Sequence, residues 1–221
     1  MKKIKNKLFS IILTTVLTLL PMFVGLLSWN ILPNELPIHF NFSGEAYGYA
    51  DKLEVIVVLP VFILVIHLCI AFATMPDSAN SVNAISDKVY FICLLIAPLV
   101  SIFCTVMIFA EALNLEFDLL TIIQVFFAVI YLIIGNYLPK MRKNKFVGTK
   151  LPWTAKSEYN WDKTNRLTGW LFFVFGLVFV VNIFVKIGKG SGVFILWITS
   201  VIVTAIIPTV YSYAISKNDN R

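Results

Sequence analysis

Six long stretches without Asp, Glu, Lys or Arg dominate this chain of 221 residues. They run from Leu8 to Leu32, Val55 to Met75, Val89 to Ala110, Leu119 to Leu138, Thr168 to Val185 and Val193 to Ile215. A helix that crosses a bilayer needs about 20 mostly apolar residues, so each stretch is long enough to be a span. Their apolar residues cover the whole helix circumference, which is typical of a helix whose surroundings are lipid or other helices.

The composition agrees with a membrane solvent. Hydrophobic side chains make up 59% of the chain and charged ones 14%, and the mean hydropathy is +0.86. A soluble domain of this size cannot bury that much apolar surface, and a membrane barrel needs polar alternation that these stretches lack. We predict an all-α integral membrane protein, a six-helix transmembrane bundle, as a single membrane domain over residues 1–221 with parts 1–75, 76–134 and 135–221.

The distribution of lysine and arginine predicts the orientation. If six spans follow one another, fifteen of the eighteen basic residues fall on the side of the N-terminus, eight of them between Lys140 and Arg166. Positively charged loops stay on the cytoplasmic side, so both ends are predicted in the cytoplasm. Membrane lipids with anionic headgroups then account for the net charge of +6, and direct nucleic-acid binding is not expected.

The first apolar stretch has a second interpretation. A basic start followed by an apolar run also resembles a cleavable signal peptide. The apolar region of a signal peptide spans only about 7 to 15 residues and ends in a small-residue cleavage site, whereas this run is longer and has no A-x-A pattern. The sequence therefore favours an uncleaved first helix.

Residues 32–52 form a segment that is predicted to lie on the outer face. Its two prolines restrict φ and prevent the first helix from continuing, while its two glycines permit tight turns. The candidate residues are Pro33, Pro37, His39, Phe40, Asn41, Gly44 and Gly48. One interpretation is a structural cap with a backbone partner for His39, which composition alone favours; the other is a recognition surface.

Residues 135–170 form a basic segment that is predicted to lie on the inner face. Its aromatic residues suit the headgroup zone of a bilayer. They are Trp153, Tyr159, Trp161 and Trp170. Because Pro152 breaks any helix that arrives from Phe146, we predict a short interfacial helix from Thr154 to Arg166 that leads into the fifth span.

Three polar side chains lie deep within the apolar stretches: His67, Gln124 and Asn182. A polar group in hydrocarbon needs a partner, so these side chains are expected to face other helices. Interhelical hydrogen bonding is favoured over a proton or substrate path, because no acidic or basic residue accompanies them in the stretches.

No pattern in the sequence points to catalysis or to a metal. It has no H-E-x-x-H, no G-x-S-x-G and no P-loop. Cys69, Cys93 and Cys104 all lie inside apolar stretches and lack the paired spacing of a metal site. We expect a protein that is not an enzyme and holds no metal.

Two segments carry a resemblance to a known family. The matching inner residues are Gly135, Asn136, Pro139, Asn144, Gly148, Pro152, Trp153, Thr154, Trp161, Thr164 and Gly169. They resemble the signature of the SdpI family of bacterial membrane immunity proteins. The matching outer residues are Pro33, Pro37, His39, Phe40, Asn41, Gly44, Gly48 and Lys52. They resemble an uncharacterised domain that often precedes that signature. Two positions depart from the pattern: Lys150 replaces the usual Arg, and the triplet Thr164, Asn165 and Arg166 replaces Thr-His-Arg.

The resemblance implies a function. It implies a multi-pass protein of the bacterial plasma membrane that protects its producer from a secreted membrane-active peptide toxin. It further implies that some members hold a soluble transcriptional repressor at the membrane, and that no cofactor is needed. Residues 33–52 are then the expected outer contact with the toxin. A small-molecule or ion transporter and a membrane sensor of another ligand are the alternatives.

Overall fold

Within the part of the chain that the structure describes, six helices are long and apolar enough to cross a membrane. The computed structural model describes residues 2–41, 44–74, 86–116, 118–187 and 191–219. The six are α1 (Lys2–Leu27), α2 (Leu59–Ala73), which continues a π-helical turn η1 (Glu54–Val58), α3 (Asp87–Ala112), α4 (Leu119–Tyr137), α6 (Glu158–Val185) and α7 (Ser191–Asp219). The prediction of an all-α protein with six membrane-spanning helices is confirmed.

The structure moves the start of the fifth span. The short helix of the inner segment is α5 (Pro152–Lys156), and it ends before α6 begins at Glu158. The Ser157 hydroxyl accepts a hydrogen bond from the backbone N–H of Asn160 at 3.2 Å and so caps the N-terminus of α6. The predicted helix from Thr154 to Arg166 is therefore wrong, because most of those residues form the first turns of the span itself.

Backbone contacts divide the chain into two compact units. The first contains α1, a β-hairpin, α2 and α3, and the second contains the helices from α4 to α7 except for Leu119, which belongs to the first. The single membrane domain over residues 1–221 stays a prediction.

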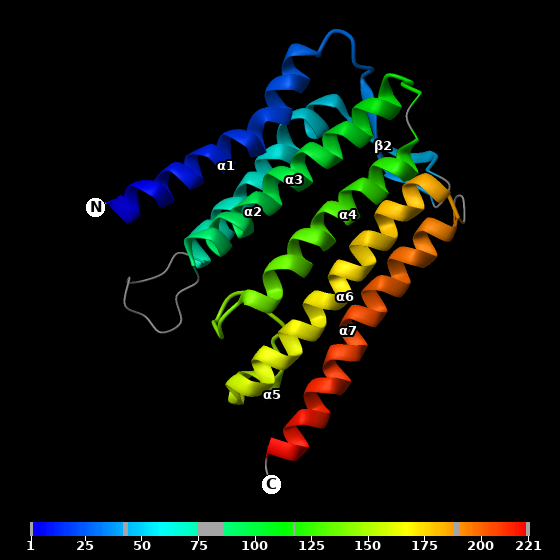
Figure 1. Cartoon of the computed structure of the whole chain (residues 1–221). Helices are drawn as coiled ribbons and strands as arrows, with labels where there is room; N and C mark the ends of the chain where they lie inside the picture. Colours follow the sequence, from blue (N-terminus) through cyan, green and yellow to red (C-terminus); the bar gives the residue numbers. More distant parts are fainter. Residues whose placement is uncertain (1, 42–43, 75–85, 117, 188–190, 220–221) are drawn as a thin grey trace. The chain divides into compact units, whose positions relative to one another are not determined.

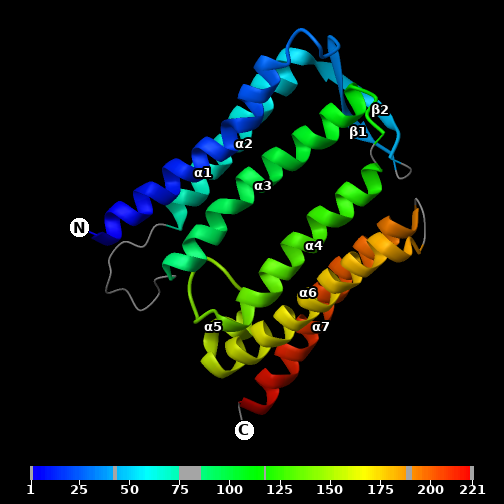
Figure 2. The ribbon, with the colours of Figure 1, turned by 45° about the horizontal axis from the view of Figure 1, so that its top comes forward.

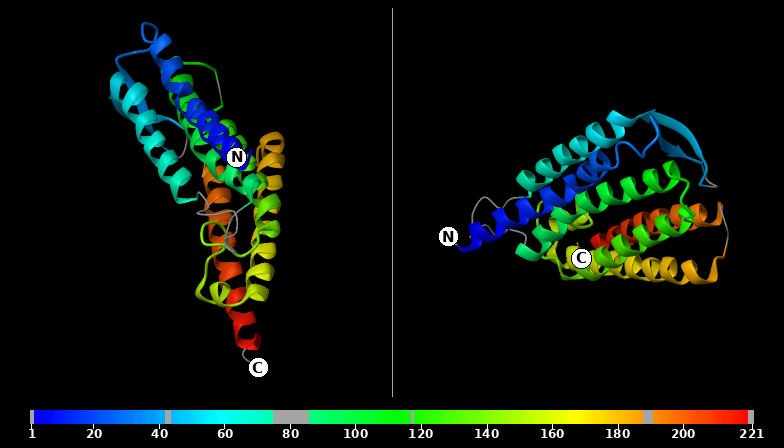
Figure 3. Two further views of the ribbon diagram at one scale, coloured as in Figure 1. Left: turned by 90° about the vertical axis from the view of Figure 1, so that its left-hand side faces the viewer. Right: turned by 90° about the horizontal axis from the view of Figure 1, so that it is seen from above.

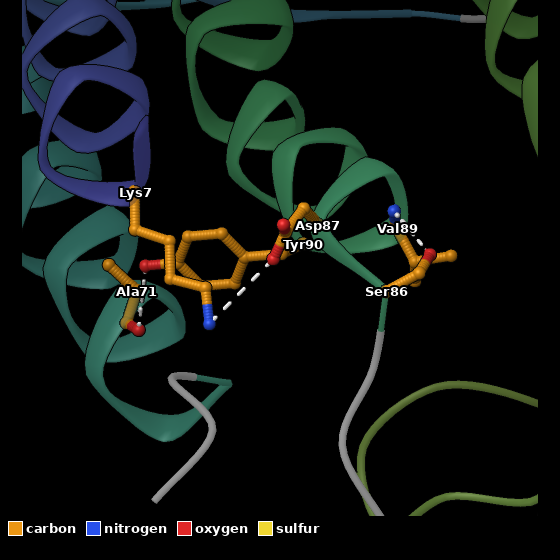
Figure 4. Close-up of polar contacts among 6 residues, drawn as sticks. All are labelled: Lys7, Ala71, Ser86, Asp87, Val89 and Tyr90. Atoms are coloured by element: carbon orange, nitrogen blue, oxygen red, sulfur yellow. Dashed lines mark hydrogen bonds and ion pairs between the residues drawn. The ribbon is translucent and has the colours of Figure 1, made fainter. Parts of the chain in front are cut away.

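In the first unit, α1, α2 and α3 pack against one another (Figures 1 and 2). Polar contacts join them at the end near the N-terminus (Figure 4). Lys7 of α1 lies 3.8 Å from the Asp87 carboxylate of α3, and the Tyr90 hydroxyl of α3 donates to the Ala71 carbonyl of α2 at 3.3 Å. Since Ser86 also caps α3 by accepting from the Val89 N–H at 3.3 Å, this end of the unit is held by side chains as well as by packing.

The outer segment is an antiparallel β-hairpin (Figure 2). Its strands are β1 (Glu35–Phe40) and β2 (Ala46–Asp51), with shifts of register on both sides of His39 that mark a bulge. Leu36 is fully buried and packs with Val55, Ile56 and Ile108. The sequence predicted a shaped loop here, and the structure shows that the shape comes from strand pairing over an apolar cluster.

In the second unit, α4, α6 and α7 run side by side (Figures 2 and 3), and aromatic side chains pack between them. Phe179 of α6 is fully buried and stacks on Phe127 of α4 with a centroid distance of 5.8 Å. Phe127 also contacts Trp197 of α7 at 5.5 Å. Aromatic pairs of this kind add stabilisation beyond the area that they bury, so these three rings fix how the helices of this unit face one another.

The predicted orientation, with both ends in the cytoplasm, has a direct test. Tyr47 on the hairpin and Lys145 in the inner segment are both exposed. In intact cells, a cysteine at position 47 is expected to react with a membrane-impermeant thiol reagent, and a cysteine at position 145 is expected to stay unlabelled until the cells are permeabilised. The parent protein, with its three native cysteines, sets the background. Labelling of both positions in intact cells would contradict the orientation.

Candidate functional site

His67 lies at the centre of a buried polar cluster in the first unit. It is fully buried on α2, and its Nε2 lies 3.2 Å from the Thr14 hydroxyl of α1. The Thr14 hydroxyl also donates to the Ser10 carbonyl at 2.7 Å, which ties this contact to the backbone of α1. No described residue hydrogen-bonds to Nδ1. The arrangement joins two helices, and none of the described residues that contact His67 is an acidic or basic partner for a proton relay.

The other two intramembrane polar residues lie in the second unit and meet each other. The Asn182 amide of α6 donates to the Gln124 carbonyl oxygen of α4 at 2.6 Å, and both side chains are buried. Each amide thus removes the other from hydrocarbon. A second buried pair joins α4 to α7. The hydroxyls of Tyr131 on α4 and Ser200 on α7 lie 2.9 Å apart.

The hairpin presents an exposed aromatic and acidic face, which we call the outer surface. It consists of His39, Tyr47, Tyr49, Glu35 and Asp51, all exposed. The rings of His39 and Tyr47 stack with centroids 5.9 Å apart. The two tyrosines are 68% and 57% exposed, far more than a ring that packs in a core.

The remaining outer candidates support this surface. A Cβ on Gly48 would lie 2.9 Å from the His39 ring, so the glycine makes room for the ring to lie across β2. Pro37 is buried, Phe40 and Asn41 are half-buried, and Pro33 is exposed. Asn41 accepts from the Glu45 N–H at 2.9 Å and donates to the Glu45 carboxylate at 2.8 Å, which closes the hairpin turn.

The turn also depends on Gly44. This residue has a φ of +88°, a conformation that side chains other than glycine rarely adopt. Its N–H donates to the Asn41 carbonyl at 3.0 Å. Asn41 and Gly44 are therefore turn residues, and among the expected contact residues His39 is the one that presents an exposed aromatic ring.

Lys52 fixes the hairpin to the end of the first helix. Its side chain is only 7% exposed, and its ammonium donates to the Trp29 carbonyl at 2.9 Å and lies 5.1 Å from the centre of the Trp29 ring. A carbonyl just beyond a helix C-terminus carries partial negative charge, which favours a cation there. This contact holds the outer surface in a fixed position relative to α1.

The inner signature residues mostly build the loop that docks on α6. Asn144 donates to the carbonyls of Arg142 and Val147, both at 2.9 Å, and accepts from the N–H groups of Phe146 and Val147, both at 2.8 Å. Gly148 follows with a φ of +134°. A Cβ on Gly148 would lie 2.5 Å from the Trp161 ring, so only glycine fits there without displacing the tryptophan.

Thr154 and Trp161 connect this loop to its neighbours. The fully buried Thr154 hydroxyl donates to the Thr149 carbonyl at 2.9 Å and accepts from the Leu151 N–H at 2.9 Å. The Trp161 indole N–H donates to the Met141 carbonyl at 3.0 Å. Because Thr154 is buried, it has no surface to offer a partner.

The other inner candidates lie at the surface of the segment or against the helices. Lys140 donates to the exposed Asn136 amide oxygen at 2.6 Å, and the Lys150 ammonium donates to the Lys145 carbonyl. Trp153 of α5 is half-buried against the Tyr213 ring of α7, with centroids 5.1 Å apart. Pro152 and Arg166 are exposed, whereas Gly135 and Pro139 pack against α6.

Sequence reasoning missed Asn160, whose buried side chain joins α6 to α7 and takes part in three hydrogen bonds. Its side chain is fully buried, donates to the Ser212 carbonyl at 2.9 Å, and accepts from the hydroxyls of Ser212 at 2.7 Å and Thr164 at 2.9 Å. Thr164 and Asn165 continue the same buried face one turn later, and Asn165 accepts from the Thr149 N–H at 2.8 Å. Asn160, Thr164 and Asn165 have the spacing of one helix face, and this pattern could have indicated a polar face that packs against another helix.

Comparison with known proteins identifies both segments. Residues 140–212 match the SdpI/YfhL protein family, and residues 16–64 match a domain of unknown function, DUF1648. The protein "Immunity protein SdpI" of Bacillus subtilis (strain 168) is 23% identical over 211 residues, which cover 95% of this chain and 97% of that protein. No solved structure matches.

These matches fall on the two segments whose geometry is described above. DUF1648 covers the C-terminal part of α1, the hairpin and the start of α2, and the SdpI/YfhL match begins at the docking loop and runs through most of α7. The order of the two segments and the similarity along nearly the whole length of a known member lead to one assignment. Residues 140–212 of this multi-pass membrane protein are an SdpI/YfhL family segment that follows a DUF1648 domain, and the chain as a whole is similar to the immunity protein of that family.

Proposed function

We propose that this protein is a membrane immunity protein, which protects a bacterial cell from a secreted membrane-active peptide toxin by binding it at the outer surface of the hairpin. The similarity to the immunity protein of Bacillus subtilis along almost the full length of both chains supports the immunity role. The proposed location is the bacterial plasma membrane.

The single observation that carries the proposed contact is the chemistry of the outer surface. Membrane-active peptides are commonly amphipathic helices with a basic face and an apolar face. The outer surface offers the complement of both, because carboxylates at Glu35 and Asp51 flank the exposed rings of His39, Tyr47 and Tyr49. Tyrosine is among the residues that most often dominate binding energy at protein interfaces.

The hairpin is also suited to binding because its backbone is fixed before a ligand arrives. The Lys52 contact with Trp29 and the buried Leu36 hold its inner face. A surface that is already ordered loses little conformational entropy on binding. The structural cap remains the competing interpretation, and it assigns no binding energy to the exposed rings.

The test is protection of cells across a dilution series of the cognate toxin. Tyr47→Ala and His39→Ala are expected to reduce the tolerated toxin concentration about tenfold, since truncation of an interface anchor costs about 1 to 2 kcal/mol. The amount of protein in the membrane fraction is expected to stay unchanged, because both rings are exposed. Asn41→Ala is a less informative change, since it also opens the turn.

Charge is tested separately with a matched pair. Glu35→Gln removes an exposed carboxylate from the outer surface, and Glu116→Gln removes an exposed carboxylate from the segment after α3. Only Glu35→Gln is expected to sensitise the cells. If the ring variants and Glu35→Gln protect as well as the parent at equal abundance, the hairpin is a structural cap and the toxin binds elsewhere.

We also propose that the inner face is where a cytoplasmic repressor would be held, as the family resemblance implies. Trp153 of α5 is the better probe of that role than Thr154, because Trp153 is half-buried near the surface whereas Thr154 is fully buried. A transporter has less support, since Gln124 and Asn182 satisfy each other and no acidic or basic residue lies in the apolar stretches that hold them.

A further inference from the structure

An open pocket of about 400 Å³ lies between residues 139–142, which follow α4, and the first turns of α6. Four basic side chains and one carboxylate line it, and we call it the basic pocket. The polar lining residues are Lys140, Arg142, Lys163, Arg166, Asp162 and Tyr159. The proposed immunity function uses none of them.

One face of α6 supplies half of the basic pocket. Tyr159, Asp162, Lys163 and Arg166 follow a spacing of three and four residues, which places them along one side of a helix. All four are exposed, whereas the opposite side of the same turns is buried. Packing of α6 therefore does not require these four side chains, and a ligand can reach them.

The other wall of the basic pocket is fixed by contacts outside it. The Met141 carbonyl accepts from the Trp161 indole at 3.0 Å, and the Arg142 carbonyl accepts from Asn144 at 2.9 Å. Gly169 lets the Pro139 ring approach α6, since a Cβ there would lie 2.4 Å from two atoms of that ring. The backbone that carries Lys140 and Arg142 is thus held against the helix that carries Lys163 and Arg166.

Within the described ranges, no ion pair neutralises the cations of the basic pocket. Among the residues that the structure describes, none of the four has a carboxylate within 4.0 Å. Lys140 donates to Asn136, and Lys163 lies 5.5 Å from the centre of the Tyr159 ring. The guanidinium groups of Arg142 and Arg166 have no side-chain partner in the described ranges, so their planar sets of donors are open to an anion.

The position along the spans indicates where such an anion comes from. The membrane-spanning segments Leu119–Lys140 and Glu158–Val185 both end at the basic pocket. Tyr159 and the exposed Trp170 lie on α6 at and just beyond this level, and such rings prefer the headgroup zone. The phosphates of lipid headgroups therefore lie at the level of the basic pocket.

We propose that the basic pocket binds the headgroup of an anionic phospholipid that carries hydroxyl groups. Arg142 and Arg166 bind the phosphodiester, since a guanidinium fork matches two phosphate oxygens. Lys140 and Lys163 add positive charge. The Asp162 carboxylate accepts hydrogen bonds from headgroup hydroxyls, which a bare phosphate does not have, and so selects a polyol headgroup.

The experiment measures lipid binding to the purified full-length protein in detergent by native mass spectrometry. The probes are phosphatidylglycerol, zwitterionic phosphatidylcholine and soluble glycerol 3-phosphate. Arg166→Gln and Arg142→Gln are each expected to weaken phosphatidylglycerol binding about tenfold or more, the loss of a charge-assisted hydrogen-bonded pair. Arg166→Lys keeps the charge but not the fork, and it is expected to restore binding only in part.

The matched control is Lys156→Gln, which removes one exposed positive charge from α5, outside the basic pocket. A diffuse attraction to anionic lipid is worth about fivefold per basic residue near the surface. Equal losses for Lys156→Gln and Arg166→Gln would overturn the proposal. Binding of glycerol 3-phosphate as tight as that of phosphatidylglycerol would overturn the lipid as the ligand. The role of the carboxylate is tested with Asp162→Asn. If this variant prefers phosphatidylglycerol over phosphatidylcholine as strongly as the parent does, that role is overturned.

Discussion

Gly135→Ala is expected to lower the free energy of unfolding by about 3 kcal/mol, and Gly135→Val to leave little folded protein in the membrane. A Cβ at this position of α4 would lie 2.5 Å from the backbone nitrogen of Phe173 and 2.8 Å from its Cα. Backbone atoms of α6 have no other rotamer to adopt, so the two helices must separate. Overpacking of this kind costs about 1 to 3 kcal/mol when the surroundings can adjust.

Helix propensity acts in the opposite direction. Alanine is favoured over glycine in a helix interior by about 1 kcal/mol, which would make the change stabilising if Gly135 faced open space. The clash outweighs the gain in helix propensity, so the change is destabilising. Separation of α4 from α6 also weakens the stacking of Phe127 on Phe179. Small residues allow transmembrane helices to approach closely, and Gly135 is such a position.

The matched control is Gly192→Ala in α7. The atom nearest to a Cβ there is the Ile187 carbonyl oxygen at 3.7 Å, an ordinary contact. Stability is measured by titration of the purified protein from mild detergent into sodium dodecyl sulfate, with tryptophan fluorescence as the signal. Equal stability of Gly135→Ala and Gly192→Ala would show that α4 and α6 do not approach each other as the structure has them.

Asn160→Ala is expected to lower the free energy of unfolding by about 2 to 3 kcal/mol. The change removes three hydrogen bonds at once and leaves the Ser212 carbonyl, the Ser212 hydroxyl and the Thr164 hydroxyl without this partner in a buried site. An unsatisfied buried polar group costs about 1 to 3 kcal/mol. The estimate is below the sum for three groups, because the two hydroxyls can turn to backbone carbonyls of their own helices.

The control for this prediction is Asn136→Ala, which removes one exposed amide that accepts from Lys140. The same titration is expected to show a loss below about 0.5 kcal/mol, as for most surface substitutions. The contacts with Ser212 also predict coupling: in a double-mutant cycle, Ser212→Ala should cost clearly less in the Asn160→Ala background than in the parent. Additive losses would mean that the two side chains do not meet.

Hydropathy was sufficient to predict the six spans, because a helix in lipid must be apolar over its whole length, and that property can be read from single segments. The hairpin was not predicted, since the prolines and glycines of residues 33–48 indicate turns while strand pairing depends on the apolar cluster beneath Leu36. Strand register also shifts at His39, which disturbs the alternation that would reveal a strand.

The hydrogen-bond partners of the buried polar residues could not be predicted from the sequence, for a related reason. Gln124 and Asn182 could each be expected to need a partner, but their separation of 58 positions gives no indication that they meet each other. In the inner segment the residue types were visible, yet their role was not. Gly148 is needed because the Trp161 ring lies over it, a contact that only the folded loop creates.

The self-contained polar contacts of the first unit have a consequence for biosynthesis. A ribosome releases α1, α2 and α3 before it has made α4, and the N-terminal parts of a chain fold first during synthesis. The contacts described between these helices join them only to one another: Thr14 to His67, Ser101 to the Thr18 carbonyl at 2.8 Å, and Tyr90 to the Ala71 carbonyl. The first three spans can therefore leave the insertion machinery with these hydroxyls already paired, and the later spans enter a bilayer in which the first unit has formed.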